Sequence, residues 1–422
     1  MNNDKNLLKR YTTYLDLLII IVFAVLLRIV LYYLFDYQKD LHGGDSAYYL
    51  EIGHNMLQYG VHGHMEIPSF YRPPLYSLFA GIIANISETA LFFYCIQSFL
   101  FIAFSVVVYF LMIEHDLHLA FYSSLLIAIS PFDALLNGRV LGENLVTPLI
   151  VTASLLFINS KKTKLKYFLS GVLLGGAVLC RDIFLLLPIL YVIAGLFSKI
   201  KIKYLSFYIL GFLLIIVPWC FRNSQLPNGG IFISKGIMWQ NLWIGTWMRN
   251  ADFLSIPGYL PPEALQTYNE GKSPDIVMTS YRNNDQLFFK QVTIQYIAKK
   301  PFNVLKTWIY RYPRLWLGTR SDLITLHLKK GSMIWYSIKS LLYLFSTILI
   351  AFGLLGIYMS LRIKRIFIFI LLPIVYTALI YLPFYNAETR YSQPVMPILT
   401  IFFIFFFTNR IQLSRKFNKL DL

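Results

Sequence analysis

Charged residues are scarce in this chain. Only 14% of its 422 residues are Asp, Glu, Lys or Arg, whereas 57% are hydrophobic and 17% are aromatic. A soluble core of this size does not require so many apolar residues, and a lipid bilayer is the simplest solvent for the excess. Acidic residues are the rarer charged type, 21 against 38 Lys and Arg, which gives a formal net charge of +17. The basic residues gather in short clusters between apolar runs, so they indicate membrane topology and not a nucleic-acid partner.

Cysteine is almost absent. Cys95, Cys180 and Cys220 lie within or at the end of apolar runs, so they offer neither a disulfide framework nor a CxxC metal pair, and we interpret them as packing residues. The sequence also lacks a repeat of fixed period, and no small-x-small cleavage pattern follows the first apolar run, 14–34. Because roughly 20 residues span about 30 Å of hydrocarbon, this run is predicted to be a retained first span.

About ten apolar runs have spanning length or nearly so. They cover approximately residues 14–34, 88–113, 117–136, 143–159, 167–180, 182–198, 203–221, 336–360, 365–384 and 391–408. If the N-terminus is cytoplasmic, the basic connections all fall on the cytoplasmic side, as the positive-inside rule requires. These are 161–166, 199–203, 362–365 and the tail 410–419. The sequence therefore predicts an all-α polytopic protein of the cytoplasmic membrane with both termini inside.

The same topology leaves two long segments outside the membrane, 35–87 and 222–335. We therefore expect an N-terminal transmembrane module, 1–221, that includes the first outer loop, then an outer-side segment, 222–335, and C-terminal transmembrane helices with a cytoplasmic tail, 336–422. Only the two outer segments are long enough to form a sizeable aqueous site. A site that faces the outside is therefore expected.

The first outer loop carries two notable motifs. Residues 42–49 read His-Gly-Gly-Asp-Ser-Ala-Tyr-Tyr, and residues 71–76 read Tyr-Arg-Pro-Pro-Leu-Tyr. Asp45 follows two glycines and opens an amphipathic run, as a helix N-cap would. The double proline after Arg72 requires only a turn into a short interfacial helix. On the residues alone, a capping role for Asp45 is as good an explanation as catalysis.

These motifs resemble the protein O-mannosyltransferase and aminoarabinose-transferase (ArnT-like) superfamily of C-type (GT-C) glycosyltransferases. Further matches are Gly-Gly-Ala-Val-Leu-Cys-Arg at 175–181, Pro-Trp-Cys-Phe-Arg-Asn at 218–223 and Arg-Tyr-Ser-Gln-Pro-Val-Met-Pro at 390–397. Each motif alone is weak, but the first-loop pattern and these three further matches, four in matching order, are fairly specific. The resemblance implies a GT-C bundle with outward-facing interfacial helices. It also implies that a hexosyl or pentosyl group passes from a polyprenyl-phosphate donor to an acceptor hydroxyl on the outer face, with inversion.

The resemblance assigns roles to a few residues. Asp45 matches the catalytic Asp of the family and would be the general base for the acceptor hydroxyl. A departing phosphate needs positive charge, which arginine supplies through a permanent charge and a fork of donors. Arg181 and Arg390, both predicted at outer ends of spans, are the first candidates for donor-phosphate binding, followed by Arg72.

Five other residues are candidates for contact with the donor or acceptor. They are Glu143, Arg139, Tyr48, Arg222 and Tyr391. Arg139 and Glu143 are four residues apart, so on one helix they would form an ion pair. Each arginine could instead be an end-of-helix residue whose head group snorkels to the interface, and we favour that role for Arg28 in the first span. The family often has proline where this chain has Asp182, and Asp182 could partly neutralise Arg181.

No cofactor is firmly implied beyond the lipid-linked donor. His62, His64 and Glu66 form a weak metal signal because no third fixed ligand accompanies the two histidines. Solvated loop histidines are the more common explanation, so we predict no metal ligand and leave open a divalent metal near the site. In the outer-side segment, Trp239, Trp243 and Trp247 would share a helix face. Sugar stacking, an interfacial aromatic belt and core packing all account for that face. Residues 286–317 are amphipathic, and we expect them to form helices on the outer leaflet.

Two other functions compete with the enzyme. A transporter or lipid flippase would usually show internal repeats or interrupted spans with polar residues near the bilayer centre. Here the ionisable residues cluster at the outer ends of the spans. A non-catalytic glycan-assembly protein would not require the Asp45 carboxylate. Protein, lipid and growing glycan all fit as the acceptor.

Overall fold

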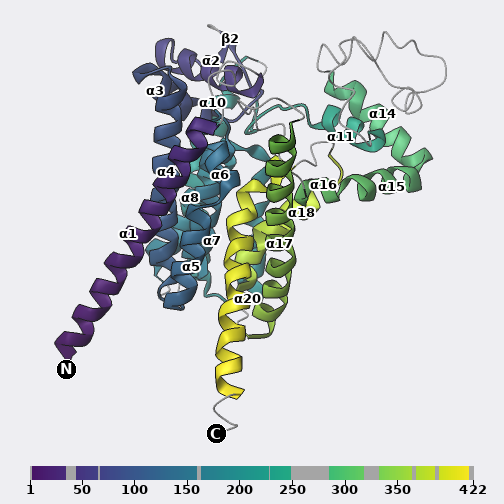
Figure 1. The fold of residues 1–422 in the computed structure, drawn as a ribbon. Helices are drawn as coiled ribbons and strands as arrows, with labels where there is room; N and C mark the ends of the chain where they lie inside the picture. Colours follow the sequence, from purple (N-terminus) through teal and green to yellow (C-terminus); the bar gives the residue numbers. More distant parts are fainter. Residues whose placement is uncertain are drawn as a thin grey trace. The chain divides into compact units, whose positions relative to one another are not determined.

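The computed structural model describes residues 2–34, 44–64, 67–158, 163–227, 229–248, 285–317, 332–363, 367–384 and 389–417 (Figure 1). This part of the chain is mostly helical, and its strands are the short β1 (Gly63–His64) and β2 (Ile67–Pro68), which pair antiparallel. The chain divides into two compact units. The first comprises Met1–Ser234, Thr319–Ile374 and Gln393–Leu422, and the second comprises Lys235–Gly318 and Val375–Ser392.

Helices of very different lengths make up most of the described part of the first unit. They are α1 (Asn2–Leu34), α2 (Gly44–Gln58), α3 (Pro74–Ile86), α4 (Ala90–Met112), α5 (Leu117–Ala128), α6 (Pro131–Leu136), α7 (Glu143–Ile158), α8 (Lys164–Cys180), η1 (Asp182–Phe184), α9 (Leu187–Phe197), α10 (Ile202–Ser224), α17 (Met333–Ile363), η5 (Gln393–Val395) and α20 (Met396–Phe417). Helix α18 (Ile368–Ile380) begins in the first unit and ends in the second.

Six helices among the described residues are long and apolar enough to cross a membrane. They are Tyr11–Leu34, Ala90–Met112, Leu117–Leu136, Ile202–Ser224, Met333–Arg362 and Thr389–Asn409. Each coincides with a predicted span, and the other predicted spans fall on the shorter helices α7, α8, α9 and α18. The prediction of an all-α polytopic membrane protein is confirmed. Within the described residues, however, only these six of the predicted spans are both long enough and apolar enough to cross a membrane.

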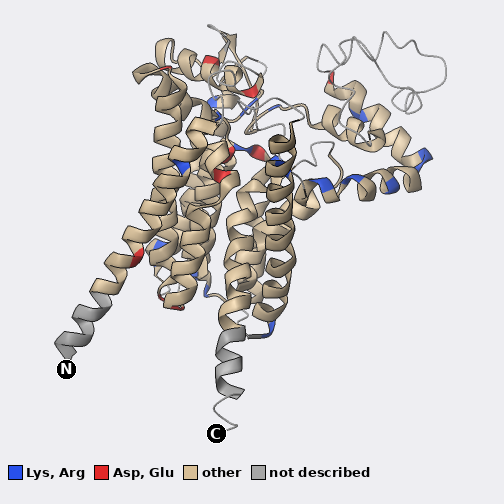
Figure 2. Ribbon diagram, in the orientation of Figure 1, with Lys and Arg blue, Asp and Glu red and all other residues tan. Residues whose placement is uncertain are grey.

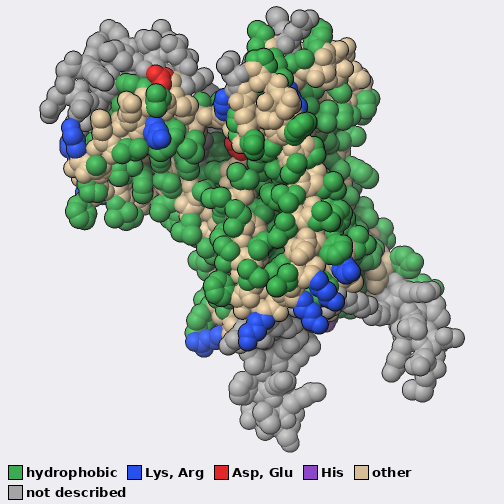
Figure 3. All heavy atoms as spheres, turned by 180° about the vertical axis from the view of Figure 1, so that it is seen from behind, with side chains coloured by type: hydrophobic (Ala, Val, Ile, Leu, Met, Phe, Trp, Pro, Cys, Tyr) green, Lys and Arg blue, Asp and Glu red, His purple; other side chains and the backbone are tan. Residues whose placement is uncertain are grey.

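The surface of the first unit fits a membrane protein. Large hydrophobic side chains of α1, α10 and α17 are widely exposed, whereas most of the span Thr389–Asn409 is buried. Figure 3 shows hydrophobic side chains over the middle of one face and Lys and Arg gathered at its lower end. Helix α1 begins and α20 ends at that lower end, while α2 and α3 lie at the opposite end (Figures 1 and 2). Such a basic end is typical of a cytoplasmic side.

Arg28 is buried inside the bundle and does not snorkel. Its Nη1 donates to the carbonyl oxygen of Ala128 at 2.8 Å, and its Nε donates to Oδ1 of Asn137 at 3.2 Å. Because α5 ends at Ala128 and α6 begins at Pro131, the last carbonyls of α5 lack a partner within the helix. The arginine satisfies one of them. Our prediction that its head group reaches the interface was therefore wrong.

The second unit contains α11 (Met238–Trp247), α14 (Gln286–Lys299), α15 (Pro301–Arg311), α16 (Pro313–Trp316) and α19 (Thr389–Ser392). Trp243 and Trp247 are buried in its core together with Phe289, and Trp239 packs against the same cluster. Of the three explanations for this tryptophan face, the structure supports core packing.

Candidate active site

The site begins with an ion pair within the segment between α1 and α4. Helix α2 starts at Gly44, whose φ is +53°, so Asp45 lies in the first turn of the helix. Oδ1 of Asp45 accepts a hydrogen bond of 2.5 Å from Nη2 of Arg72, which lies 27 residues downstream. The partial positive charge at a helix N-terminus also favours a carboxylate at this position. Asp45 and Arg72, two sequence-predicted site residues, are therefore in direct contact.

Three tyrosine rings surround Arg72. Its guanidinium carbon lies 5.2 Å from the ring centroid of Tyr48, 4.8 Å from that of Tyr49 and 5.4 Å from that of Tyr71. Nη1 of Arg72 also donates to the hydroxyl of Tyr49 at 3.0 Å. Burial disfavours the charged form of Arg72, but Tyr49, Asp45 and Tyr71 outweigh burial and raise its pKa above the ordinary value. Arg72 is therefore a permanently charged, rigidly held group.

A close approach between α2 and α3 holds this pair in place. A Cβ atom on Gly53 would overlap the carbonyl oxygen of Ser77, and a Cβ atom on Gly81 would overlap the backbone of Gly53. The helices can therefore touch only because both positions are glycine. Helix α2 carries Asp45, and Arg72 stands two residues before α3, so this contact sets the distance between the charged groups.

A second ion pair joins α7 to the end of α8. Arg181 follows the last residue of α8, and its Nη1 donates to Oε1 of Glu143, the first residue of α7, at 2.8 Å. The Glu143 side chain is only 1% exposed and that of Arg181 14%. The hydroxyl of Ser234 donates to the Asp182 carboxylate. Arg139 lies in the turn before α7, so it does not share a helix with Glu143, and the helical spacing behind that predicted pair does not occur.

Tyr49 connects the two ion pairs. Its side chain is buried, and burial raises the pKa of its hydroxyl. The charges of Arg72 and Arg181 lower that pKa, whereas the charges of Glu143 and Asp45 raise it. A Cβ atom on Gly142 would lie 3.4 Å from the Tyr49 hydroxyl oxygen and 3.7 Å from Cγ of Arg181. The arginine of each ion pair therefore lies close to the same buried phenol.

Tyr49 was missing from the candidates taken from the sequence. It stands four residues after Asp45, and positions i and i+4 share a face of a helix. That spacing could have identified it.

His62 anchors the rest of the loop. It is buried, its Nδ1 lies 3.0 Å from the carbonyl oxygen of Ser69, and its ring packs edge-on against Trp219 at 5.1 Å. Burial lowers its pKa to about 4, and the nearby charge of Arg222 adds to this effect. The prediction of a solvated histidine was therefore wrong for His62. Among the described residues no cluster of three or more His, Cys, Asp or Glu could hold a metal ion; Glu66 and the His64 side chain lie outside them.

The other candidates have local partners. The hydroxyls of Tyr48 and Ser69 lie 3.2 Å apart. Arg222 donates to Oδ1 of Asn223 at 2.9 Å and lies over the ring of Trp219.

Arg390 and Tyr391 belong to the second unit. Nη2 of Arg390 donates to the Tyr391 hydroxyl at 3.2 Å, and the Tyr391 ring packs against Tyr381. The convergence of Arg390 with Arg181 stays a prediction.

Comparisons with known proteins identify the fold. No protein-family model and no curated protein matches the chain. Among solved structures, it is similar to the archaeal oligosaccharyltransferase AglB from Archaeoglobus fulgidus in complex with an inhibitory peptide and a dolichol-phosphate. The identity is 18% and the TM-score 0.52, over 98% of this chain and 52% of AglB, so the chain spans about half the length of that protein.

A second similarity is to ArnT from Cupriavidus metallidurans bound to undecaprenyl phosphate, at 14% identity and a TM-score of 0.40, over 91% of this chain and 77% of ArnT. That score is too low to support a fold assignment. AglB is itself a GT-C glycosyltransferase. Because its sequence identity to the chain is only 18%, the similarity shows a shared fold and nothing more. The chain is therefore a polytopic membrane protein with the fold of the C-type glycosyltransferases.

Proposed function

We propose that the protein is a membrane glycosyltransferase that transfers a sugar from a polyprenyl-phosphate donor to an acceptor hydroxyl at the outer face, with inversion. The observation that carries the proposal is the convergence of Asp45, Arg72, Glu143 and Arg181 around Tyr49. The dolichol-phosphate in the AglB complex supports a lipid phosphate as the donor class. The reaction needs one carboxylate and nearby cationic groups, and this cluster contains both.

Asp45 is the general base in this proposal. Its carboxylate takes the proton from the acceptor hydroxyl while the oxygen attacks the anomeric carbon. The bond between that carbon and the phosphate oxygen breaks, and the lipid phosphate leaves with the electron pair. A single in-line displacement inverts the anomeric carbon. The phosphate is already a good leaving group, so no separate acid is required.

Arg72 orients this base. The sequence resemblance placed Arg72 with the donor phosphate, but its contacts with Asp45 and Tyr49 favour a positioning role. Nη2 of Arg72 donates to a carboxylate oxygen of Asp45, and Nη1 donates to the hydroxyl of Tyr49. Such a fixed carboxylate meets the acceptor hydroxyl without reorganisation at the moment of reaction.

Arg181 is the first candidate to bind the departing phosphate, with Arg390 as the second. Its guanidinium is a permanent cation with a fork of N–H donors that matches phosphate oxygens. Glu143 would hold the guanidinium in place, and Arg181 is the more exposed member of the pair. Tyr48, Arg139, Arg222 and Tyr391 remain candidates for contacts with the sugar or the acceptor.

The test compares cells that produce wild-type protein, no protein, Asp45→Asn or Glu51→Gln. Glu51 is the matched control because it is an exposed carboxylate on the same helix. Mass spectrometry of surface glycans and glycolipids should reveal a sugar that is present with wild type and Glu51→Gln and absent in the other two. Equal amounts of folded protein are verified by size-exclusion chromatography.

The same experiment separates the competing functions. A flippase would change the distribution of the lipid-linked sugar without forming a new glycosidic bond. A non-catalytic assembly protein would support the modification equally well with Asn at position 45. Either outcome would contradict the proposal.

A further inference from the structure

Helix α15 of the second unit has two faces of opposite character. Val304, Thr307 and Arg311 are buried within the unit. Arg311 donates to the carbonyl oxygens of Gly245 and Met248, where α11 ends and its last carbonyls lack helical partners. This face is therefore fixed to the unit, and Arg311 points inward.

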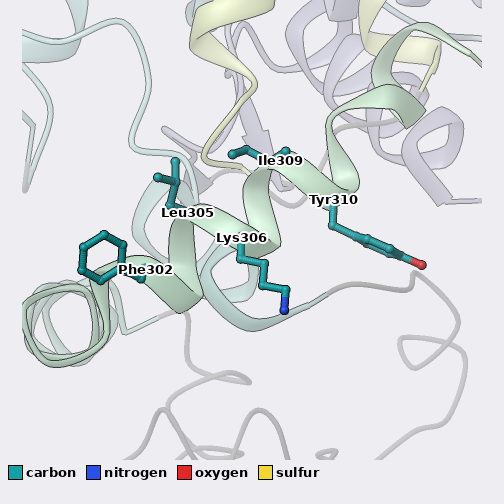
Figure 4. Close-up of a pocket in the computed structure, with 5 residues that line it drawn as sticks. All are labelled: Phe302, Leu305, Lys306, Ile309 and Tyr310. Carbon is teal, nitrogen blue, oxygen red and sulfur yellow. The ribbon is translucent and has the colours of Figure 1, made fainter.

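The opposite face of α15 is apolar and exposed. Phe302, Leu305, Lys306, Ile309 and Tyr310 line one shallow hollow, and Figure 4 shows them along a single helix. Their positions, i, i+3, i+4, i+7 and i+8, form one stripe of a helix. Phe302 is 83% exposed, Ile309 60% and Leu305 46%. So large an apolar stripe is unusual on a surface that meets only water.

Basic residues accompany this stripe. Lys306 lies within it, and Lys299 and Lys300 are exposed just before the first turn of α15. Apolar side chains bordered by lysines are complementary to a bilayer surface, where the acyl chains lie beneath anionic phosphates. A lipid bilayer is also the one partner that a polytopic membrane protein always has beside it.

We propose that α15 is seated in the surface of the bilayer by this stripe, with Phe302, Leu305 and Ile309 among the acyl chains and Lys299, Lys300 and Lys306 against anionic lipid phosphates. The stripe is a lipid-binding surface of the second unit that recognises anionic lipid. This inference does not depend on the reaction that the protein catalyses.

The test places an environment-sensitive fluorophore on the stripe of the full-length protein in nanodiscs. Cys95, Cys180 and Cys220 are replaced by Ala, and a nitrobenzoxadiazole label is attached through Leu305→Cys. The matched control is Gln291→Cys, an exposed polar position on α14. The label at position 305 should be quenched by lipids with nitroxide on their acyl chains and be several-fold less accessible to iodide than the label at 291.

The lysines are tested in the same system. Adding phosphatidylglycerol to phosphatidylcholine nanodiscs should blue-shift the label at position 305 and strengthen its quenching by nitroxide lipids. The combined Lys299→Gln, Lys300→Gln and Lys306→Gln substitutions should abolish that response. Iodide quenching equal to that at 291 would show that the stripe lies in water, and protection from both quenchers would show that protein covers it. Either result, or a response to phosphatidylglycerol that survives loss of the lysines, would overturn the proposal.

Discussion

The hydroxyl oxygen of Tyr49 accepts a hydrogen bond of 3.0 Å from Arg72, the residue whose guanidinium also binds Asp45. Tyr49 thereby holds the arginine that holds the carboxylate. The same phenol lies close to Arg181, since a Cβ atom on Gly142 would contact both residues, so Tyr49 neighbours both the arginine that binds the base and the phosphate candidate. Its removal should disturb both.

Tyr49→Phe deletes the acceptor of this hydrogen bond and leaves the ring in place. Because a hydrogen bond to a charged group contributes about 1.5–3 kcal/mol, the variant should unfold at a lower temperature. Turnover should fall by about tenfold to a hundredfold because the carboxylate is less well oriented. Tyr59→Phe is the control, since Tyr59 has an exposed side chain in the same loop and no part in the proposed site. Equal kinetics for the two variants would remove Tyr49 from the site.

The Arg181–Glu143 pair can be dissected by its unequal burial. Arg181→Ala leaves the carboxylate of Glu143 buried without this partner, which typically costs about 3–5 kcal/mol of stability. Glu143→Gln should cost less, because Arg181 is the more exposed residue and can reach water.

The double variant Arg181→Met and Glu143→Gln separates folding from function. It buries no unpaired charge, so its thermal stability should return close to wild type while turnover stays low. Recovered turnover in this variant would show that Arg181 has no part in binding the donor phosphate.

His62 should make the protein sensitive to acid. Its pKa in the folded protein is about 4, below the ordinary 6.5, so between these values the unfolded state binds more protons. Stability is therefore fully present above about pH 6.5 and is lost as the pH falls toward 4. The loss between pH 7 and pH 5 should be about 2 kcal/mol.

The measurement is thermal unfolding in nanodiscs at both pH values. His62→Asn keeps a donor near the Ser69 carbonyl and does not titrate, so the difference between pH 7 and pH 5 should be smaller in this variant. An equal difference in both proteins would show that His62 is charged within the fold or does not control the effect.

The predicted topology places Lys164 inside and Asn283 outside. Single cysteines near these two positions should react differently with an impermeant reagent in intact cells: only the site near 283 should be labelled. Residue 283 lies outside the described residues, and Lys164 begins α8. Labelling of the site near Lys164 would refute a cytoplasmic N-terminus.

Hydropathy was sufficient to predict the helices, because a bilayer imposes length and apolarity on each span. The family motifs also led to Asp45, Arg72 and Arg181. The partners of these residues were not predictable, since Arg72 lies 27 residues from Asp45 and Arg181 lies 38 from Glu143. Such contacts depend on how helices approach one another, as the glycines at 53 and 81 allow for α2 and α3.

Local rules failed where tertiary structure overrode them. The spacing of Arg139 and Glu143 fits a helix, but the chain turns between them. Arg28 is close enough to the end of its span to reach the interface, yet a break between two other helices supplies a carbonyl oxygen instead. His62 stands in the segment between two helices and is nevertheless covered by Trp219. For Arg28 and His62 the deciding neighbour is distant in sequence.

The most direct test of the central claim is the single-turnover rate of Asp45→Asn in nanodiscs, measured with the donor that mass spectrometry identifies. The substitution keeps the shape of the side chain and an oxygen that can accept from Arg72, but removes its basicity. We predict that turnover falls by about a hundredfold or more while donor affinity changes little, and that Glu51→Gln behaves as wild type. Turnover within a few-fold of wild type would contradict the claim and make Glu143 the next candidate for the base.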